Sequence, residues 1–265
     1  MIKDYKKKFD LKNKLAFVAG GSGYIGSEIV HALSSMNCKV VILDIFSNIN
    51  YNNKNIQNEY IDLSNVSKLE KSFKKIIKKY GMADIFINAS YPRTKDWKKN
   101  SFQKISLKSF EKNLKIHLNS YIWCSKIMAE NMVKNKIKGS IINLSSIYGL
   151  VGQDLEIYKG TDMKDNLSYS VIKGGINNFT KQMSSYYGRF NIRANAICPG
   201  GVINNEDKKK LKVQKLFERN YLKKVPLKRF ARTDEIASAV VFLSCDASSY
   251  ITGTLLVVDG GWTAI

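Results

Sequence analysis

Residues 15–26 read Leu-Ala-Phe-Val-Ala-Gly-Gly-Ser-Gly-Tyr-Ile-Gly, an apolar run that leads directly into a glycine-rich turn. This pattern predicts a strand, a tight turn and the first turn of a helix. Glycine permits such a turn and a close approach to its backbone, while the helix N-terminus attracts an anion. We therefore expect a pyrophosphate-binding loop of a dinucleotide site, formed by Gly20, Ser22, Gly23, Tyr24, Ile25 and Gly26.

Further apolar runs alternate with segments of helical periodicity along the rest of the chain. Because these runs are almost entirely apolar, we expect strands buried on both faces, as in a parallel sheet covered by helices. The sequence thus predicts an α/β fold, a Rossmann-type doubly wound parallel sheet in a single domain over residues 1–265. The expected strands are 15–19, 39–44, 59–61, 84–88, 140–144, 193–198 and 255–258. The expected helices are 24–36, 66–80, 106–135, 168–190 and 234–245.

The net charge of the chain is +21, from 43 Lys and Arg against 22 Asp and Glu. Such a charge can attract nucleic acid or an anionic surface. The lysines are scattered, however, and no nucleic-acid-binding motif accompanies them, so we expect no nucleic-acid partner. The same positive field would help to attract a phosphorylated substrate or cofactor.

The four cysteines are far apart and form no Cys-x-x-Cys pair, and the chain has only two histidines. We interpret the cysteines as reduced thiols and expect no metal site. No apolar run approaches the ~18 residues of a membrane span, and the first residues lack the apolar core of a signal peptide. The sequence therefore predicts a cytoplasmic protein without a membrane partner.

An acidic residue, Asp44, ends the second expected strand, 24 residues beyond Gly20. A carboxylate at this place accepts hydrogen bonds from the adenosine ribose and repels a 2′-phosphate. The next residues, Ile45 and Phe46, offer no cation for that phosphate. The sequence predicts that NAD(H) is preferred, without excluding NADP(H). An aspartate that only caps the following turn is the alternative.

A tyrosine and a lysine at helical spacing, Tyr169 and Lys173, mark the second half of the chain. The other Tyr-x-x-x-Lys match, Tyr91/Lys95, contains a proline and falls in an expected loop. Positions i and i+4 share one face of a helix, and an ammonium beside a phenol favours the phenolate. We therefore expect Lys173 to lower the pKa of Tyr169, which would act as a proton donor or acceptor.

Together these motifs resemble the short-chain dehydrogenase/reductase family over nearly the whole chain. The resemblance implies hydride transfer between a nicotinamide and a secondary alcohol or ketone. It places Ser146, after the fifth expected strand, beside Tyr169 in catalysis, and it places Lys173 on the nicotinamide ribose. The other cofactor contacts that it implies are Asp62, Leu63, Asn88, Ala89, Ser90, Pro199, Gly200 and Val202.

The chain also departs from the family pattern. Its glycine spacing is that of the extended, sugar-nucleotide-modifying branch, whereas the remainder resembles the classical branch. His117 stands where the family has a catalytic asparagine, so a catalytic role and plain packing both remain open. Ser146 and Tyr169 are 23 residues apart, more than is usual, and the extra residues 153–165 should form a loop over the site.

Two stretches, 89–93 and 145–149, look like those of flagellin-modification or surface-glycan dehydrogenases. Within them, Arg93 and Tyr148 are candidate substrate contacts, although Arg93 could equally be a solvated loop residue. Residues 204–224 occupy the position of the family's substrate loop and carry many lysines. We therefore expect an anionic substrate, a phosphorylated sugar or a nucleotide-sugar.

Other functions remain open from the sequence. A 3-oxoacyl reductase or a polyol dehydrogenase would share the catalytic residues. A sugar-nucleotide epimerase or dehydratase would fit the glycine spacing, but we expect no separate substrate domain after Gly260-Gly261. A cofactor sensor or nucleic-acid-binding protein without activity would fit the charge alone. The family resemblance also implies a homodimer or homotetramer built on the two long helices.

Overall fold

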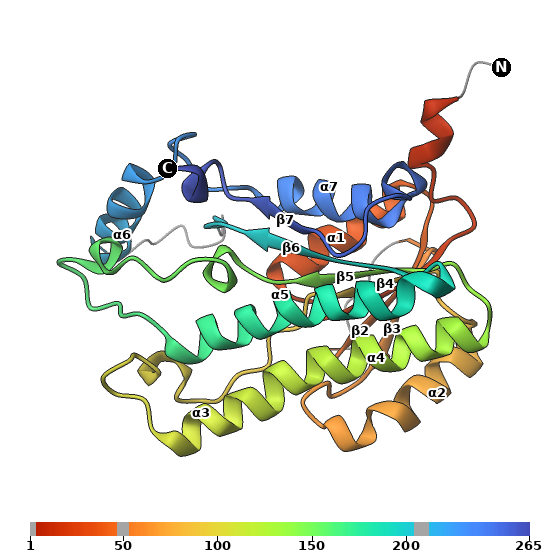
Figure 1. The fold of residues 1–265 in the computed structure, drawn as a ribbon, viewed down its shortest axis with the longest axis horizontal. Helices are drawn as coiled ribbons and strands as arrows, with labels where there is room; N and C mark the ends of the chain where they lie inside the picture. Colours follow the sequence, from red (N-terminus) through yellow and green to blue (C-terminus); the bar gives the residue numbers. More distant parts are fainter. Residues whose placement is uncertain (1–3, 47–52, 204–211) are drawn as a thin grey trace.

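Seven parallel strands form one sheet in the order β3-β2-β1-β4-β5-β6-β7 (Figure 1). The computed structural model describes residues 4–46, 53–203 and 212–265. The strand order reverses between β1 and β4, which is the switch point where doubly wound sheets bind ligands. The predicted fold class is therefore confirmed. The strands are β1 Leu15–Ala19, β2 Lys39–Asp44, β3 Ile56–Tyr60, β4 Ile85–Asn88, β5 Ser140–Leu144, β6 Arg193–Pro199 and β7 Leu255–Val258.

Helices cover both faces of the sheet in two layers. Helices α1 and α7 pack on one face, and α2, α4 and α5 pack on the other (Figure 1). Helix α6 lies at one end of the molecule, near the carboxyl ends of the strands. The helices are α1 Tyr24–Ser35, α2 Leu69–Tyr80, α3 Leu107–Asn113, α4 Asn119–Lys134, α5 Leu167–Tyr187, α6 Lys212–Lys223 and α7 Thr233–Ser244.

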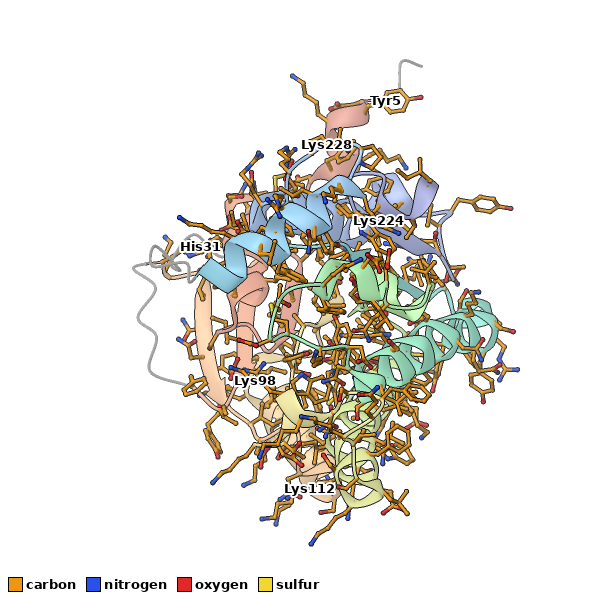
Figure 2. The ribbon with its side chains drawn as sticks, turned by 90° about the vertical axis from the view of Figure 1, so that its left-hand side faces the viewer. Tyr5, His31, Lys98, Lys112, Lys224 and Lys228 are labelled. Carbon is orange, nitrogen blue, oxygen red and sulfur yellow. The ribbon has the colours of Figure 1, made fainter. Side chains whose placement is uncertain are left out.

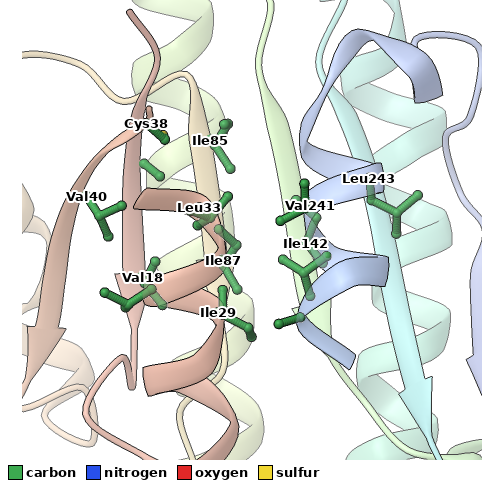
Figure 3. Close-up of a cluster of buried hydrophobic side chains, with 14 of the residues drawn as sticks. Val18, Ile29, Leu33, Cys38, Val40, Ile85, Ile87, Ile142, Val241 and Leu243 are labelled. Carbon is green, nitrogen blue, oxygen red and sulfur yellow. The ribbon is translucent and has the colours of Figure 1, made fainter. Parts of the chain in front are cut away.

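The two cores follow from the alternation of side chains along each strand. On β1, Val18 points into the core with α1 and α7, whereas Phe17 points into the core with α2, α4 and α5. Figure 3 shows the first core, where Ile29 and Leu33 of α1 lie near the side chains of the central strands. An all-apolar strand is thus required at the centre of the sheet.

The structure differs from the sequence prediction in three elements. β3 begins at Ile56, three residues before the expected strand. The expected helix 106–135 is interrupted by a π-helical turn, Leu114–Leu118, between α3 and α4. Part of the expected substrate loop 204–224 is helix α6, and residues 204–211 lie outside the described residues. The insert 153–165 is a loop with one short 3₁₀ turn, Leu155–Tyr158.

Candidate active site

Two cavities open beside each other at the carboxyl ends of the strands, and Tyr169 lines both of them. The larger, which we call the strand-end cavity, has a volume of about 880 Å³. The smaller, which we call the aromatic cavity, has a volume of about 360 Å³. Sequence-predicted residues lining the strand-end cavity are Gly20, Ser22, Gly23, Tyr24, Ile25, Gly26, Asp44, Asp62, Leu63, Ala89, Ser90, Arg93, Lys173 and Pro199. Those lining the aromatic cavity are Ser146, Tyr148, Gly200 and Val202.

The glycine-rich loop has the geometry of an anion site. Gly20 adopts a φ of +76°, and a Cβ there would lie 2.6 Å from the Ser90 Cα, so only glycine fits. A Cβ on Gly26 would collide with the carbonyl oxygen of Gly20. Gly23, the N-cap of α1, supplies no side-chain cap, which leaves first-turn N–H groups for a ligand. These residues fit the pyrophosphate of a dinucleotide.

Asp44 holds the loop and faces the strand-end cavity. Its Oδ2 accepts a hydrogen bond from the Ser22 N–H at 3.0 Å, and its Oδ1 accepts one from the Ile45 N–H at 2.7 Å. The side chain is only partly buried, so the carboxylate keeps room for further donors. On the same side, the Asp62 carboxylate accepts from the Ser64 N–H and hydroxyl at 3.0 and 2.6 Å.

The ends of β4 and β5 are joined by buried polar contacts. The Ser90 hydroxyl donates to Asn88 Oδ1 at 2.7 Å, and the Tyr121 hydroxyl lies 3.0 Å from the Ser90 carbonyl and 3.1 Å from that of Leu144. Asn88 is fully buried and lies behind the cavity wall, while Ala89 and Ser90 form the wall itself. The Asn88 side chain therefore supports the site from below.

Ser146, Tyr169 and Lys173 converge between the two cavities. Ser146 follows β5, and the side chain of Asn166 caps α5 by accepting from the Tyr169 N–H at 2.9 Å. This cap places Tyr169 in the first turn and Lys173 one turn later on the same face. The Lys173 Nζ donates to the Leu144 carbonyl at 2.8 Å and lies 5.6 Å from the centre of the Tyr169 ring.

Burial controls the protonation of this group. Burial lowers the pKa of Lys173 to about 7, so its ammonium is only partly charged at neutral pH. Burial also raises the pKa of Tyr169, against a hydrogen bond with Ser146 that lowers it. The expectation that Lys173 lowers the pKa of Tyr169 is therefore wrong for this structure. A protonated phenol is the prevailing form of Tyr169 at neutral pH.

His117 lies in the π-helical turn and is fully buried. Neither ring nitrogen has a hydrogen-bond partner among the residues that the structure describes, and the imidazole packs against Tyr91 and Tyr121 at ring distances of 5.1 and 5.5 Å. Burial, helped by the charge of Lys173, holds the pKa of His117 well below its usual value. The imidazole is therefore neutral, lines neither cavity, and touches the site through aromatic contacts.

The aromatic cavity contains residues that the sequence analysis missed. Its walls come from the insert, from α6 and from the segment before α7: Tyr158, Phe217, Tyr221 and Phe230. Phe217 and Tyr221 are four residues apart in a lysine-rich segment, a spacing that is typical of one helix face. That spacing was the available signal for α6. Arg93 lies instead in the strand-end cavity, with its guanidinium 5.3 Å from the centre of the Tyr91 ring.

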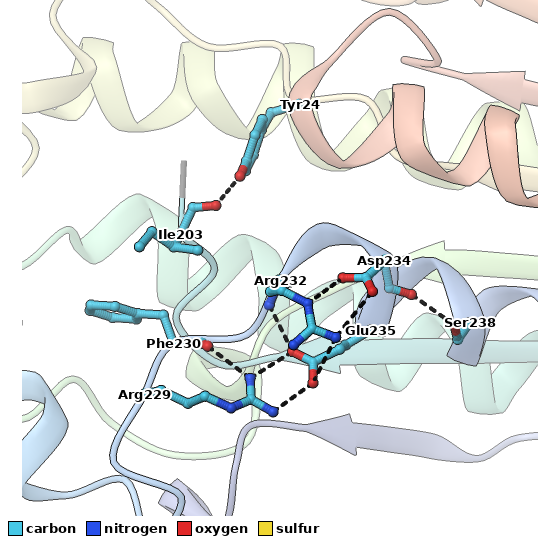
Figure 4. A network of polar contacts seen from close by, with 8 residues as sticks. All are labelled: Tyr24, Ile203, Arg229, Phe230, Arg232, Asp234, Glu235 and Ser238. Carbon is cyan, nitrogen blue, oxygen red and sulfur yellow. Dashed lines mark hydrogen bonds and ion pairs between the residues drawn. The ribbon is translucent and has the colours of Figure 1, made fainter. Parts of the chain in front are cut away.

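Polar contacts fasten the segments around both cavities (Figure 4). The Tyr24 hydroxyl donates to the Ile203 carbonyl and so links the glycine-rich loop to the chain after β6. Arg229 donates to both oxygens of Glu235 at 2.7 and 2.6 Å, which ties the segment carrying Phe230 to the first turn of α7. The Arg232 N–H also donates to Glu235 at 2.8 Å.

Comparison with known proteins agrees with this geometry. The family model described as enoyl-(acyl carrier protein) reductase matches residues 19–263. The chain is 32% identical over 261 residues to the post-translational flagellin modification protein A of Campylobacter coli, covering 95% of this chain and 99% of that protein. It is 30% identical to a 3-oxoacyl-(acyl-carrier-protein) reductase of Buchnera aphidicola, covering 95% and 98% respectively.

A solved structure shows the same architecture. The short-chain dehydrogenase of Leptospira borgpetersenii, solved with bound NAD+, superposes with a TM-score of 0.86 at 28% identity, covering 99% of this chain and 97% of that one. The chain therefore belongs to the short-chain dehydrogenase/reductase family and is an NAD(P)-dependent oxidoreductase.

None of the helices within 4–46, 53–203 and 212–265 is long and apolar enough to cross a membrane. Over the same ranges, no group of three or more His, Cys, Asp or Glu side chains could hold a metal ion.

Proposed function

We propose that this protein is an NAD-preferring dehydrogenase/reductase that interconverts a secondary alcohol and a ketone on a phosphorylated sugar or nucleotide-sugar. The observation that carries the proposal is the position of Tyr169, which lines both cavities beside Ser146 and Lys173. A substrate in the aromatic cavity and a cofactor in the strand-end cavity would then both lie next to Tyr169, the proposed proton donor. The relative named for flagellin modification supports a role in modifying a surface protein, and we propose that this role is surface-glycan biosynthesis.

A nicotinamide dinucleotide, when bound, supplies the hydride for reduction or accepts it in oxidation. During reduction, the Tyr169 phenol donates its proton to the carbonyl oxygen of the substrate, and the Ser146 hydroxyl donates a hydrogen bond to the same oxygen. Donors aimed at the developing negative charge stabilise the transition state. The raised pKa of Tyr169 keeps its proton available for reduction at neutral pH.

The cofactor is held by the groups at the strand ends. First-turn N–H groups of α1 would bind the pyrophosphate, and Asp44 would accept hydrogen bonds from the adenosine ribose. Asp62 and Leu63 would hold the adenine, and Lys173 would hold the nicotinamide ribose. Since the Asp44 carboxylate would repel a 2′-phosphate, Asp44→Asn should bring the affinities for NADH and NADPH closer together, which paired titrations measure.

Several further proposals rest on the family resemblance. His117 takes the place of the catalytic asparagine, and Asn88, Gly200 and Val202 shape the nicotinamide end of the site. Helix α6 borders the substrate site, and the protein works as a homodimer or homotetramer. Size-exclusion chromatography with light scattering measures the subunit number directly.

Turnover tests the substrate class. Oxidation of NADH is followed with keto forms of phosphorylated sugars and nucleotide-sugars, and with an acetoacetyl thioester as the comparison. Turnover of the sugars supports the proposal, and an increased KM in Arg93→Ala would add that residue to the substrate site. Exclusive turnover of the thioester would favour a second candidate, a 3-oxoacyl reductase, which the 30% identical relative and the aromatic cavity wall support.

A further inference from the structure

A third cavity, of about 530 Å³, lies between the insert and helix α6. Among the described residues, the lining contains four cations, Lys159 from the insert with Arg219, Lys223 and Lys224 from α6 and its end, and one acidic residue, Glu156. We call it the basic groove. Figure 2 looks onto this end of the molecule and labels Lys224 close to α6. The groove is therefore strongly positive.

The cations of the basic groove are only partly neutralised. Lys159 pairs with Glu156 at 3.4 Å, and Lys224 pairs with Asp154. Arg219 and Lys223 are exposed and have no ion-pair partner within the part of the chain that the structure describes. Two unpaired cations one helical turn apart on α6 can therefore face the same anion.

The basic groove adjoins the aromatic cavity. Tyr158 and Phe217 line the aromatic cavity, and their stacked rings are 5.8 Å apart. The next residue of the insert, Lys159, lines the basic groove, as does Leu216, which precedes Phe217 on α6. The two cavities thus lie on either side of one contact between the insert and α6. The Asn220 side chain strengthens this contact by donating to the Lys159 carbonyl at 3.0 Å.

The linings of the two cavities differ in chemistry. The described lining of the aromatic cavity is mainly aromatic and apolar, whereas that of the basic groove carries four cations. A phosphate would be attracted to the cations of the basic groove. The neutral ring of a sugar suits the aromatic walls, since aromatic faces pack well on its C–H groups.

We infer that the basic groove is the subsite for a phosphate or diphosphate group of the substrate, whose neutral reacting ring occupies the aromatic cavity. The guanidinium of Arg219 can bind phosphate oxygens through two N–H groups, and Lys223 adds a point charge. The substrate passes the Tyr158–Phe217 pair to reach both cavities. This inference rests on the proposed function, because it concerns the same substrate.

The first test uses inorganic pyrophosphate as the probe, titrated calorimetrically at constant ionic strength with saturating NADH. The bound NADH keeps pyrophosphate away from the glycine-rich loop. We expect pyrophosphate to bind at least ~10-fold more weakly to Arg219→Gln/Lys223→Gln than to the wild type. The matched control, Lys71→Gln/Lys75→Gln, removes two exposed lysines one turn apart on α2 and should stay within about twofold.

Absence of pyrophosphate binding to the wild type, or equal binding to the Arg219/Lys223 variant, would overturn the inference. The NADH titration that precedes each experiment reports separately on the proposed function. If NADH binds and pyrophosphate does not, only the basic groove assignment fails. If NADH itself does not bind, the proposed function fails first and the assignment to a substrate site falls with it.

A second test distinguishes a substrate phosphate from a separate phosphate-containing effector. Uridine diphosphate glucose, a probe that joins a diphosphate to a neutral ring, is added to the pyrophosphate-loaded protein. We expect it to displace pyrophosphate from the wild type, and we expect Phe217→Ala to weaken uridine diphosphate glucose binding while leaving pyrophosphate binding unchanged. A substrate that spans the basic groove and the aromatic cavity would be contradicted if uridine diphosphate glucose failed to displace pyrophosphate. It would also be contradicted if Phe217→Ala weakened the binding of both ligands equally.

Discussion

The two cavities that meet at Tyr169 are built in different ways. The strand-end cavity is lined mainly by residues that directly follow β1, β2, β3 and β4, so the sheet fixes much of its shape. The aromatic cavity adds large side chains from the insert, α6 and the segment before α7, which are far apart in the sequence. Under the proposed function, the sheet would position the cofactor, whereas the packing of peripheral segments would select the substrate.

The difference between the two cavities is tested most strongly at Tyr169, the residue that lines both of them. Tyr169→Phe removes the proposed proton donor and keeps the ring that lines both cavities, so turnover of any ketone that the wild type reduces should fall ~10²–10⁴-fold. NADH affinity should stay within about twofold. Kinetics and NADH titration measure the two effects, and Tyr186→Phe, an exposed tyrosine on the same helix, is the control. Wild-type turnover in Tyr169→Phe would remove this residue from the mechanism.

The titration of Lys173 tests how strongly burial shifts the pKa of a side chain at the boundary between the two cavities. Its pKa is about 7 in the folded protein against an ordinary value of 10.5, so the unfolded chain binds more protons between these values. Wild-type stability should therefore rise with pH across this window, by up to about 1.4 kcal/mol per pH unit from this group. The destabilisation by Lys173 is complete below pH 7 and disappears as the pH approaches 10.5.

Lys173→Met should accordingly gain stability relative to the wild type at pH 6 and lose that advantage towards pH 10. The lost hydrogen bond to the Leu144 carbonyl adds an offset that does not depend on pH. Chemical denaturation from pH 6 to 10 without added cofactor measures the difference. A stability difference that is constant over this range would show that the lysine titrates at its ordinary pKa.

Gly20→Ala tests the strand-end cavity alone. The substitution forces a side chain onto a backbone with φ of +76° and against the Ser90 Cα, so the loop must move. We expect the Kd for NADH to rise at least ~10-fold, equivalent to about 1.4 kcal/mol. Gly188→Ala, whose Cβ would meet open space, is the control. Unchanged NADH affinity would mean that this loop does not hold the cofactor.

The smallest effect is expected for the ion pair between Arg229 and Glu235, which holds one wall of the aromatic cavity in place. Glu235→Gln weakens the pairing with Arg229 that holds the segment carrying Phe230. The pair is partly exposed, so its loss should reduce the free energy of unfolding by about 1 kcal/mol or less. The pKa of Glu235 is lowered to about 2 by its hydrogen bonds, so this contribution should vanish as the pH falls from 4.5 to 2.

Thermal unfolding and NADH titration check the Glu235→Gln variant. We expect a slightly lower Tm and an unchanged NADH affinity. An altered affinity would show that the two cavities are not independent, which contradicts the comparison.

The sheet and the positions of the candidate catalytic residues could be predicted because their signals are local. β1, β2 and β5 have the predicted bounds, since an apolar run between polar turns is sufficient to mark a buried strand. The positions of Ser146 and Tyr169 follow from the end of a strand and the start of a helix. Parallel strands bring such ends together at one edge of the sheet, so residues distant in the sequence meet there.

Helix α6, the π-helical turn and the pKa of Tyr169 could not be predicted, because they depend on three-dimensional packing that is not evident from the sequence pattern. In α6, the four-residue spacing of Phe217 and Tyr221 is a weak signal among many charged residues, and the packing of these rings against the insert is what shows their role. The π-helical turn at His117 is a local change of helix geometry without a sequence signal of its own. The pKa of Tyr169 was mispredicted because its burial, rather than the neighbouring lysine, dominates.

The central claim is that the strand-end cavity holds NAD, and thermal unfolding at physiological salt tests it most directly. The Tm is measured with NADH, with NADPH and without cofactor, since a ligand that binds only the folded state raises stability. The account predicts a clear increase with NADH and a smaller one with NADPH, because of Asp44. No increase with either cofactor, or a larger one with NADPH, would contradict it.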